Sequence, residues 1–191
     1  MGVALADNLA CEGALVDLIL GPSHVRPVER EVTLHPVHTA NEMYEKALSL
    51  FPTADGAIMS AAVSDYRPAT QASQKMKREA GTELSLTLLP NPDIAASLGK
   101  QKRADQVLVG FALETQNEEL HAREKRTKKN LDFIVLNSLQ DEGAGFGGDT
   151  NQIHIIDAAD NVESFALKTK TEVAADIVNK LCSFMGDAGY L

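Results

Sequence analysis

Hydrophobic residues follow two spacings that alternate along the chain. In some segments they recur every three or four residues, which is typical of a helix with one buried face, and in others they form short runs typical of strands. The helical spacing predicts helices near residues 3–11, 40–50, 91–100, 116–129 and 171–185. The short runs predict strands near residues 15–20, 31–37, 56–63, 83–89, 107–113, 131–137, 152–157 and 162–168.

Residues that begin and end helices support several of these boundaries. Thr39 is placed to cap the helix of residues 40–50, and Pro52 to end it. Pro92 suits the first position of the helix that opens at Asn91.

The alternation of strands and helices predicts a single α/β domain. We expect a three-layer, Rossmann-like fold: a mainly parallel sheet with helices on both faces, closed by a C-terminal hairpin. No internal repeat and no linker rich in Pro, Gly or Ser divides the chain. A predicted helix opens the sequence, whereas a strand and its phosphate-facing loop usually precede the first helix of such a fold.

Composition excludes several classes of protein. The chain has 191 residues, of which 44% are hydrophobic and 24% charged, unlike disordered, collagen-like or disulfide-rich chains. No apolar run approaches the roughly 18 residues of a membrane span, so we expect a cytoplasmic protein with no membrane partner. Cys11 and Cys182 lie too far apart for a cysteine zinc site, and we expect both to be small buried residues.

The cations of this acidic chain are clustered. Residues 121–130 hold five cations and one acid, a local charge of +4, and because the whole chain carries −9, the rest carries −13. Lys125 and Lys129 are four residues apart, so they share a helix face and can reach one phosphate chain. A solvated surface is the alternative that this pattern leaves open.

Small and polar residues follow the predicted strand 56–63, at the end where open α/β sheets bind ligands. Ser60, Ala61 and Ala62 would let a flat ring or a ribose approach the backbone. Asp65 is then placed for a ribose hydroxyl or a metal-bound water. A solvated loop with an Asx turn is the alternative interpretation.

The next 17 or so residues lack clear periodicity, which is typical of a lid, a binding loop or a disordered piece. Lys75, Lys77 and Arg78 lie in this segment. A mobile basic lid would suit an anionic substrate, and an exposed run of charges is an equal alternative. Because neither basic segment contains aromatic residues that stack on bases, nucleic acid is not an expected partner.

Two further segments belong to the same predicted sheet edge. Asn91, Pro92, Asp93 and Ile94 open a helix whose backbone N–H groups could bind an anion, although a plain helix start is the alternative. Phe111 ends a strand and could flank a base, although a lone Phe is more often part of the core. The sequence contains no Walker A, GxGxxG or GxSxG motif.

Five motifs occur together in a fixed order: SAAVSDYRP at 60–68, KxK at 75–77, LLPNPDI at 88–94, VGFALET at 109–115 and EKRTKKNLDFIVLN at 124–137. In this order and at these separations they resemble phosphopantothenoylcysteine synthetase. The resemblance covers nearly the whole chain. In bacteria this domain is commonly the C-terminal part of a protein fused to phosphopantothenoylcysteine decarboxylase.

The resemblance implies a phosphopantothenate-cysteine ligase of coenzyme A biosynthesis that depends on CTP and Mg²⁺. The carboxylate of phosphopantothenate would attack the α-phosphorus of CTP to give an acyl-cytidylate and pyrophosphate. The amine of cysteine would then form the amide and release CMP. The implied small-molecule partners are CTP, phosphopantothenate and cysteine. The implied protein partners are the fused or associated decarboxylase and a second copy of the chain, in a homodimer whose interface includes the flap, the segment after Asp65 that contains Lys75. FMN would belong only to the decarboxylase part and not to this chain.

The resemblance also implies roles for particular residues. Nucleotide-binding positions would be Ser60, Ala61, Ala62, Asp65, Lys75, Asn91, Pro92, Asp93, Ile94, Phe111, Lys125 and Lys129. Lys75, on the flap, would cover the reacting phosphate as the catalytic cation. These roles agree with the chemistry, because two anions must meet and charge builds on the transferred phosphoryl group. No metal ligand is assigned.

The sequence departs from the family at its start, where the family has a strand and a Ser-Ser-Gly-Lys-like loop ahead of the first helix. We expect a single ligase domain over residues 1–191 that lacks this strand and its glycine-containing loop. Two other functions stay open. One is a nonenzymatic nucleotide-binding or dimerisation fragment, and the other, less favoured because the glycine fingerprint is missing, is an NAD(P)-dependent oxidoreductase.

Overall fold

The computed structural model describes residues 1–70, 72, 74–75, 83–114, 117–138 and 149–187. The helices in these ranges match those that the hydrophobic spacing predicts: α1 (Gly2–Cys11), α2 (Ala40–Leu50), α3 (Ile94–Gln101), α4 (Glu118–Lys128) and α5 (Lys170–Asp187). Thr39 caps α2 as predicted, because its hydroxyl oxygen accepts a hydrogen bond of 3.1 Å from the backbone N–H of Glu42. A 3-10 turn, η1 (Phe51–Thr53), ends the helix at Pro52.

The central sheet has five strands in the order β10-β9-β7-β6-β3. Its parallel part comprises β3 (Gly56–Met59), β6 (Val107–Glu114) and β7 (Phe133–Ser138). β9 (Ile153–Asp157) is antiparallel to β7 and forms the predicted hairpin with β10 (Val162–Ser164). The sheet is therefore mixed, with a parallel centre and an antiparallel edge.

Two other strands form a separate parallel pair. β1 (Val16–Leu20) and β2 (Val32–Pro36) pair in register from Val16 with Val32 to Leu20 with Pro36. Within the described residues, no strand pairing joins them to β3. Parallel pairing thus predominates, as predicted, but in two sheets rather than one. The expected lack of a first strand and its loop stays a prediction.

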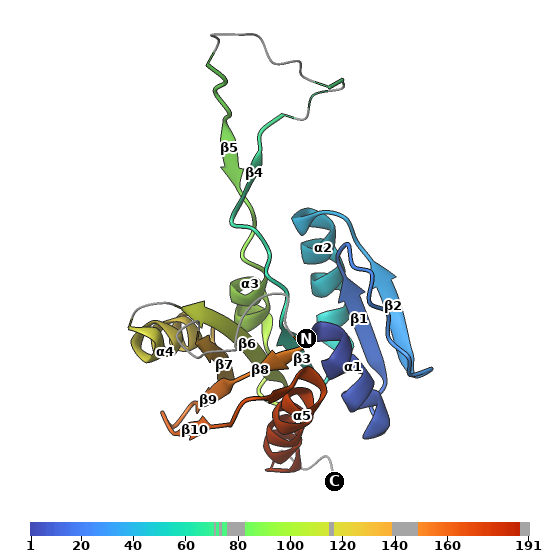
Figure 1. Ribbon diagram of the computed structural model, residues 1–191, viewed down its shortest axis with the longest axis vertical. Helices are drawn as coiled ribbons and strands as arrows, with labels where there is room; N and C mark the ends of the chain where they lie inside the picture. The colour runs from blue at the N-terminus through green and yellow to red at the C-terminus, as the bar shows by residue number, and fades with distance from the viewer. Residues whose placement is uncertain (71, 73, 76–82, 115–116, 139–148, 188–191) are drawn as a thin grey trace.

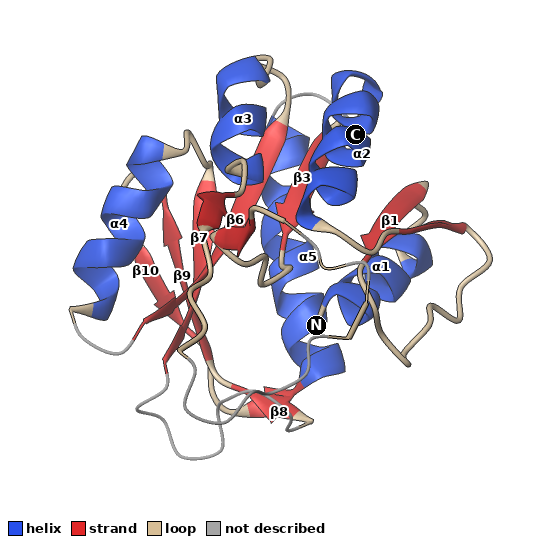
Figure 2. Ribbon diagram, turned by 90° about the horizontal axis from the view of Figure 1, so that it is seen from above, coloured by secondary structure: helices blue, strands red, loops and turns tan. Residues whose placement is uncertain are grey.

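Helices cover both faces of the central sheet, which confirms the predicted α/β class (Figure 2). Successive residues of a strand point to opposite faces, and β6 shows this directly. Val107 and Val109 pack with α1 and α5, whereas Leu108 and Ala112 pack with α2, α3 and α4. Two hydrophobic clusters, one on each face, therefore hold the layers together.

An antiparallel ribbon of β4 (Tyr66–Pro68) and β5 (Leu88–Pro90) projects from the body of the protein (Figure 1). We call residues 66–90 the arm. The predicted strand 83–89 is wrong in extent, because pairing is limited to Leu88–Pro90. Two short strands, β8 (Thr150–Asn151) and β11 (Lys168–Thr169), form another antiparallel pair.

The structure corrects three smaller predictions. The strand predicted over 56–63 ends at Met59. Pro92 is not the first helical residue, since Asp93 caps α3 and the helix begins at Ile94. Cys11 and Cys182 are exposed rather than buried, because each lies on the outer side of its amphipathic helix. None of the helices in the described ranges is long and apolar enough to cross a membrane.

Candidate functional site

The parallel pairing of β3 and β6 brings several of the predicted residues to one edge of the sheet. Met59 pairs with Gly110, so Ser60 leaves β3 close to the level at which Phe111 continues β6. Ser60 is half-buried and packs against the start of α1, where a β-carbon on Gly2 would lie 3.0 Å from its hydroxyl oxygen. Ala61 and Ala62 are exposed. The small residues after β3 thus leave the backbone at this edge accessible.

Lys125 of α4 and Lys129, the residue that caps the end of α4, both lie near Asp93. The Nζ of Lys125 donates a hydrogen bond of 2.9 Å to the backbone carbonyl of Phe111. The Nζ of Lys129 lies 2.9 Å from Oδ2 of Asp93. The (i, i+4) spacing therefore places both ammonium groups near the N-terminal end of α3, with Lys125 bonded to β6 one residue beyond its last pair with β3.

Asp93 is both a helix cap and the acidic partner of a cation. Its Oδ1 accepts a hydrogen bond of 3.0 Å from the backbone N–H of Ala96 in the first turn of α3. Partial burial raises the pKa of Asp93, but the hydrogen bonds from Ala96 and from Lys129 outweigh it and hold the pKa below its usual value. The carboxylate is therefore charged at neutral pH and holds the ammonium of Lys129 in place.

The C-terminal end of α4 is packed tightly against α3. A β-carbon at Gly99 would overlap the carbonyl oxygen of Lys129 and lie 2.9 Å from its carbonyl carbon. The side-chain amide of Asn130, a residue with φ of 54°, donates a hydrogen bond of 2.8 Å to the carbonyl of Gly99. Only glycine permits this approach, so Gly99 helps to fix the position of Lys129.

Asn91 ties together the base of the arm. Its backbone N–H donates to the carbonyl of Asp65 at 2.7 Å, and its side-chain amide donates to the carbonyl of Ser64 at 2.8 Å. Arg67 donates to the Oδ1 of Asn91 at 3.0 Å and to the carbonyl of Pro90 at 2.8 Å. The carboxylate of Asp65 stays exposed at this edge. The sequence analysis missed Arg67, although an arginine directly before a proline in the SDYRP motif was a signal for such an anchor.

Three of the predicted residues lie elsewhere or offer only their backbone. The side chain of Ile94 is 4% exposed and belongs to the core. The ring of Phe111 packs on the α1 and α5 face, away from α3 and α4. Lys75 is exposed in the segment between β4 and β5 and has no hydrogen bond or ion pair to another described residue. Lys77, its partner in the KxK motif, lies outside the described residues.

The two arginines of α4 lie on the flank of the helix opposite to Lys125 and Lys129. Arg123 and Arg126 both contact Asp160, which lies in the turn between β9 and β10. Sequence reasoning treated the cations of this helix as one cluster and missed Asp160. The structure divides them: among the contacts of the described residues, those of Lys125 and Lys129 are with Phe111 and Asp93, whereas those of Arg123 and Arg126 are with Asp160.

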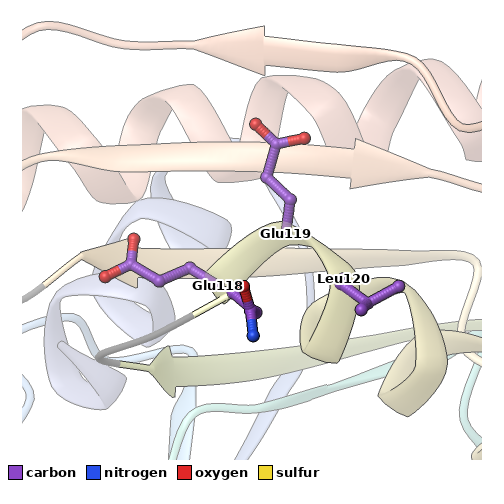
Figure 3. A pocket seen from close by; sticks show the side chains of 4 residues that line it. Glu118, Glu119 and Leu120 are labelled. Carbon is purple, nitrogen blue, oxygen red and sulfur yellow. The ribbon is translucent and has the colours of Figure 1, made fainter.

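A depression of about 370 Å³ lies at the N-terminal end of α4 and is lined by Asn117, Glu118, Glu119 and Leu120 (Figure 3). The side chains of Glu118 and Glu119 point in different directions. We assign it no ligand, because its acids do not converge and would repel an anion. In the described part of the chain, no three His, Cys, Asp or Glu side chains form a group that could hold a metal ion.

Comparison with known protein families matches residues 1–185 to the DNA/pantothenate metabolism flavoprotein C-terminal domain. Among curated relatives, a cysteine/cysteine sulfinic acid decarboxylase from an unknown prokaryotic organism is 50% identical over 185 residues, which is 97% of this chain and 51% of that protein. The coenzyme A biosynthesis bifunctional protein CoaBC of Bacillus subtilis (strain 168) is 38% identical over 189 residues, 99% of this chain and 46% of that protein. The chain thus spans about half the length of these relatives.

Solved structures share the fold. The crystal structure of the C-terminal domain of CoaBC superposes with a TM-score of 0.81 at 31% identity, covering 97% of this chain and 82% of that chain. A structure of Cab2 in complex with phosphopantothenate-cysteine superposes with a TM-score of 0.76, covering 98% of this chain and 77% of that chain. At 14% identity, the second likeness concerns the fold alone.

Proposed function

Because the chain belongs to the family of DNA/pantothenate metabolism flavoprotein C-terminal domains, we propose that it is a ligase of coenzyme A biosynthesis that joins phosphopantothenate to cysteine at the expense of CTP. The observation that carries this proposal is that Lys125 and Lys129 both lie near Asp93, the cap of α3, with Lys125 also bonded to the carbonyl of Phe111 in β6. The CoaBC relatives, which are described as bifunctional proteins of coenzyme A biosynthesis, support the substrate class.

The proposed reaction has two steps. A carboxylate oxygen of phosphopantothenate forms a bond to the α-phosphorus of CTP, and the bond from that phosphorus to the bridging oxygen of pyrophosphate breaks. The amine of cysteine then forms a bond to the acyl carbon of the resulting acyl-cytidylate. CMP leaves with the electron pair of the acyl C–O bond, and the amine loses a proton as the amide forms.

The residues of the sheet edge suit this chemistry. Both reacting partners are anions, and the ammonium groups of Lys125 and Lys129 would offset their repulsion and bind the phosphate chain. The exposed backbone at Ala61 and Ala62 and the first N–H groups of α3 would receive the base and ribose. Lys75, on the arm, would close over the α-phosphate and exclude water, which protects the reactive acyl-cytidylate.

Mg²⁺ fits this donor set only if the nucleotide supplies ligands. Asp65 offers one exposed carboxylate at the edge, and Mg²⁺ is usually held by one or two carboxylates together with substrate phosphates. When bound, it would neutralise phosphate charge. No flavin is proposed for this chain. An FMN-dependent decarboxylase, fused or associated, is the proposed partner, in keeping with the bifunctional and decarboxylase names of the relatives.

We also propose that the protein is a homodimer whose interface includes the arm. Leu84, Leu86 and Leu88 are 68%, 59% and 52% exposed, and their spacing of two puts them on one side of an extended segment. Exposed leucines in such a row favour association with an apolar partner surface. The resemblance to the synthetase family, which implies a homodimer that includes this region, makes a second copy of the chain the proposed partner.

The reaction is tested by following two products separately. Pyrophosphate release should require CTP, Mg²⁺ and phosphopantothenate but not cysteine, whereas CMP release should require cysteine as well. CTP binding without pyrophosphate release would indicate a nucleotide-binding or dimerisation fragment instead. Thermal stabilisation by NADP rather than by CTP would favour an oxidoreductase.

A further inference from the structure

Cations of α4 and of its C-cap residue, Lys129, contact other elements on two flanks of the helix. Lys125 reaches Phe111 in β6, and Lys129 reaches Asp93, the cap of α3. Arg123 and Arg126 reach the turn between β9 and β10. An α-helix turns by about 100° per residue, so its rotation about its own axis decides where both pairs point.

Asp160 binds both arginines. Its Oδ1 lies 3.1 Å from Nη1 of Arg123 and 3.2 Å from Nη2 of Arg126. Its backbone carbonyl accepts a second hydrogen bond from Arg123 at 3.0 Å. An isolated surface ion pair contributes little, and the side chain of Asp160 is 59% exposed, but here one carboxylate joins two cations, of which Arg126 is only 12% exposed.

The position of Asp160 is set by its own turn rather than by α4. The carboxylate of Asp157 accepts hydrogen bonds of 2.9 and 3.0 Å from the backbone N–H groups of Ala159 and Asn161. Asp160 itself has a φ of 63°, a left-handed conformation that Asp tolerates better than most residues. The hairpin therefore sets the backbone of Asp160 without help from α4, and α4 places its two arginines against it.

Hydrophobic packing gives α4 little rotational restraint. Ala122 is its single buried side chain within the described residues, and Leu120 is 56% exposed. A helix with such a small apolar face is not held in one rotation by burial alone. The polar contacts on the two flanks of α4 therefore supply the rotational restraint that hydrophobic packing does not.

We infer that Asp160 is a positioning residue for the nucleotide site: by holding Arg123 and Arg126 it fixes the rotation of α4 that brings Lys125 to Phe111 and Lys129 to Asp93. The inference rests on the proposed function of that site. The loss of charge alone would change the affinity for CTP in the opposite direction. Removal of the carboxylate makes the surroundings of α4 more positive, which would tighten the binding of an anion. The direction of the change therefore separates the two effects.

The test compares Asp160→Asn with Glu163→Gln. Glu163 lies on the same hairpin and pairs with Lys180 of α5 at 3.3 Å, so its variant removes the same charge without touching α4. For each protein we would measure the dissociation constant of CTP with Mg²⁺ and the amide hydrogen exchange of α4. Asp160→Asn should weaken CTP binding roughly tenfold and speed exchange in α4, whereas Glu163→Gln should match the wild type. Asp160→Glu should recover part of the affinity.

Equal or tighter CTP binding in Asp160→Asn, or unchanged exchange in α4, overturns the inference. In a Lys129→Ala background the substitution should cost less affinity, and full additivity also overturns it. If Asp160→Asn does not fold, Arg126→Lys tests the same contact from the helix side without a change of charge, and weaker CTP binding with faster exchange in α4 is again the expected result. A wild-type protein that does not bind CTP overturns the proposed function and the inference together, whereas binding that Asp160→Asn leaves unaffected overturns the inference alone.

Discussion

Lys129 and Asp93 form an ion pair between the end of α4 and the start of α3, with 2.9 Å between Nζ and Oδ2. The pair joins the helix that carries the predicted phosphate-binding lysines to the helix whose first turn faces the same edge. Each member has a second task, since Asp93 caps α3 and Lys129 ends α4. Substitutions of Lys129 and of Asp93 can therefore test ligand binding and stability separately.

Replacement of either α4 lysine should weaken CTP binding. Lys125→Ala and Lys129→Ala should each raise the Michaelis constant for CTP roughly 10- to 100-fold with little change in turnover, the scale of one lost hydrogen bond to a charged group. Steady-state kinetics with varied CTP measure this. Lys128→Ala, an exposed cation of the same helix, is the control and should behave as the wild type. A normal Michaelis constant with reduced turnover would contradict the assignment.

The Asp93 pair should make stability depend on pH. The pKa of Asp93 is lower in the folded protein than its ordinary value of 3.8, so the charged form stabilises the fold above that value, and this contribution is lost as the pH falls through the folded pKa. Asp93→Asn keeps a capping side chain but loses the charge. Its thermal midpoint should lie below that of the wild type at pH 7, and the gap should close as the pH falls below 3.8 and through the folded pKa.

The control for this measurement is Asp55→Asn, which changes an exposed carboxylate away from the helix ends. Its midpoint should follow the wild type at every pH. A gap between Asp93→Asn and the wild type that stays constant into the acid range would rule out the ionic contribution.

Gly99 should tolerate no side chain. Gly99→Ala places a β-carbon against the backbone of Lys129, which cannot move as a flexible side chain does, so α3 or α4 must shift. We expect a loss of about 1–3 kcal/mol in the free energy of unfolding and a raised Michaelis constant for CTP. Gly21→Ala is the matched control, because nothing lies within 4 Å of its β-carbon. Equal unfolding free energies for the two variants would refute the close contact.

Lys75 should affect catalysis and not folding. Lys75→Ala should lower the rate of pyrophosphate release roughly 100-fold, the scale of losing one positioned charge donor. Its thermal midpoint should not change, because Lys75 is exposed and contacts no other described residue. Lys100→Ala, an exposed lysine of α3, is the control. An unchanged rate of pyrophosphate release would remove Lys75 from the mechanism.

The arm should hold the proposed dimer together. Leu86→Asp puts a charge into the row of exposed leucines and should convert a dimer into a monomer in sedimentation velocity, because burying an unpaired charge in an interface is costly. Leu15→Asp, a leucine that is 91% exposed on the body of the protein, should leave the assembly intact. A wild-type protein that is monomeric at high concentration would contradict the dimer itself.

Much of the fold could be predicted from the sequence because it depends on local periodicity. The helical spacing in α2 and α5 and the buried runs of β6 and β7 are properties of neighbouring residues, and they gave the right elements within a few positions. The arm was harder, because β4 is three residues long and exists only through its pairing with β5. Pro92 misled the prediction of where α3 begins, since Asp93 is the better cap.

The sequence by itself determined the order of the elements, the α/β class and the placement of Lys125 and Lys129 on one helix face. Each of these follows from chain geometry over a few residues, so no partner distant in sequence is needed to specify it. Only the tertiary structure decided which cations face the ligand edge, since Asp160 lies 34 residues beyond Arg126 and binds it through space. It also decided that Phe111 offers a carbonyl rather than its ring to Lys125, because the pleat of β6 within the packed sheet sets the face to which each side chain points.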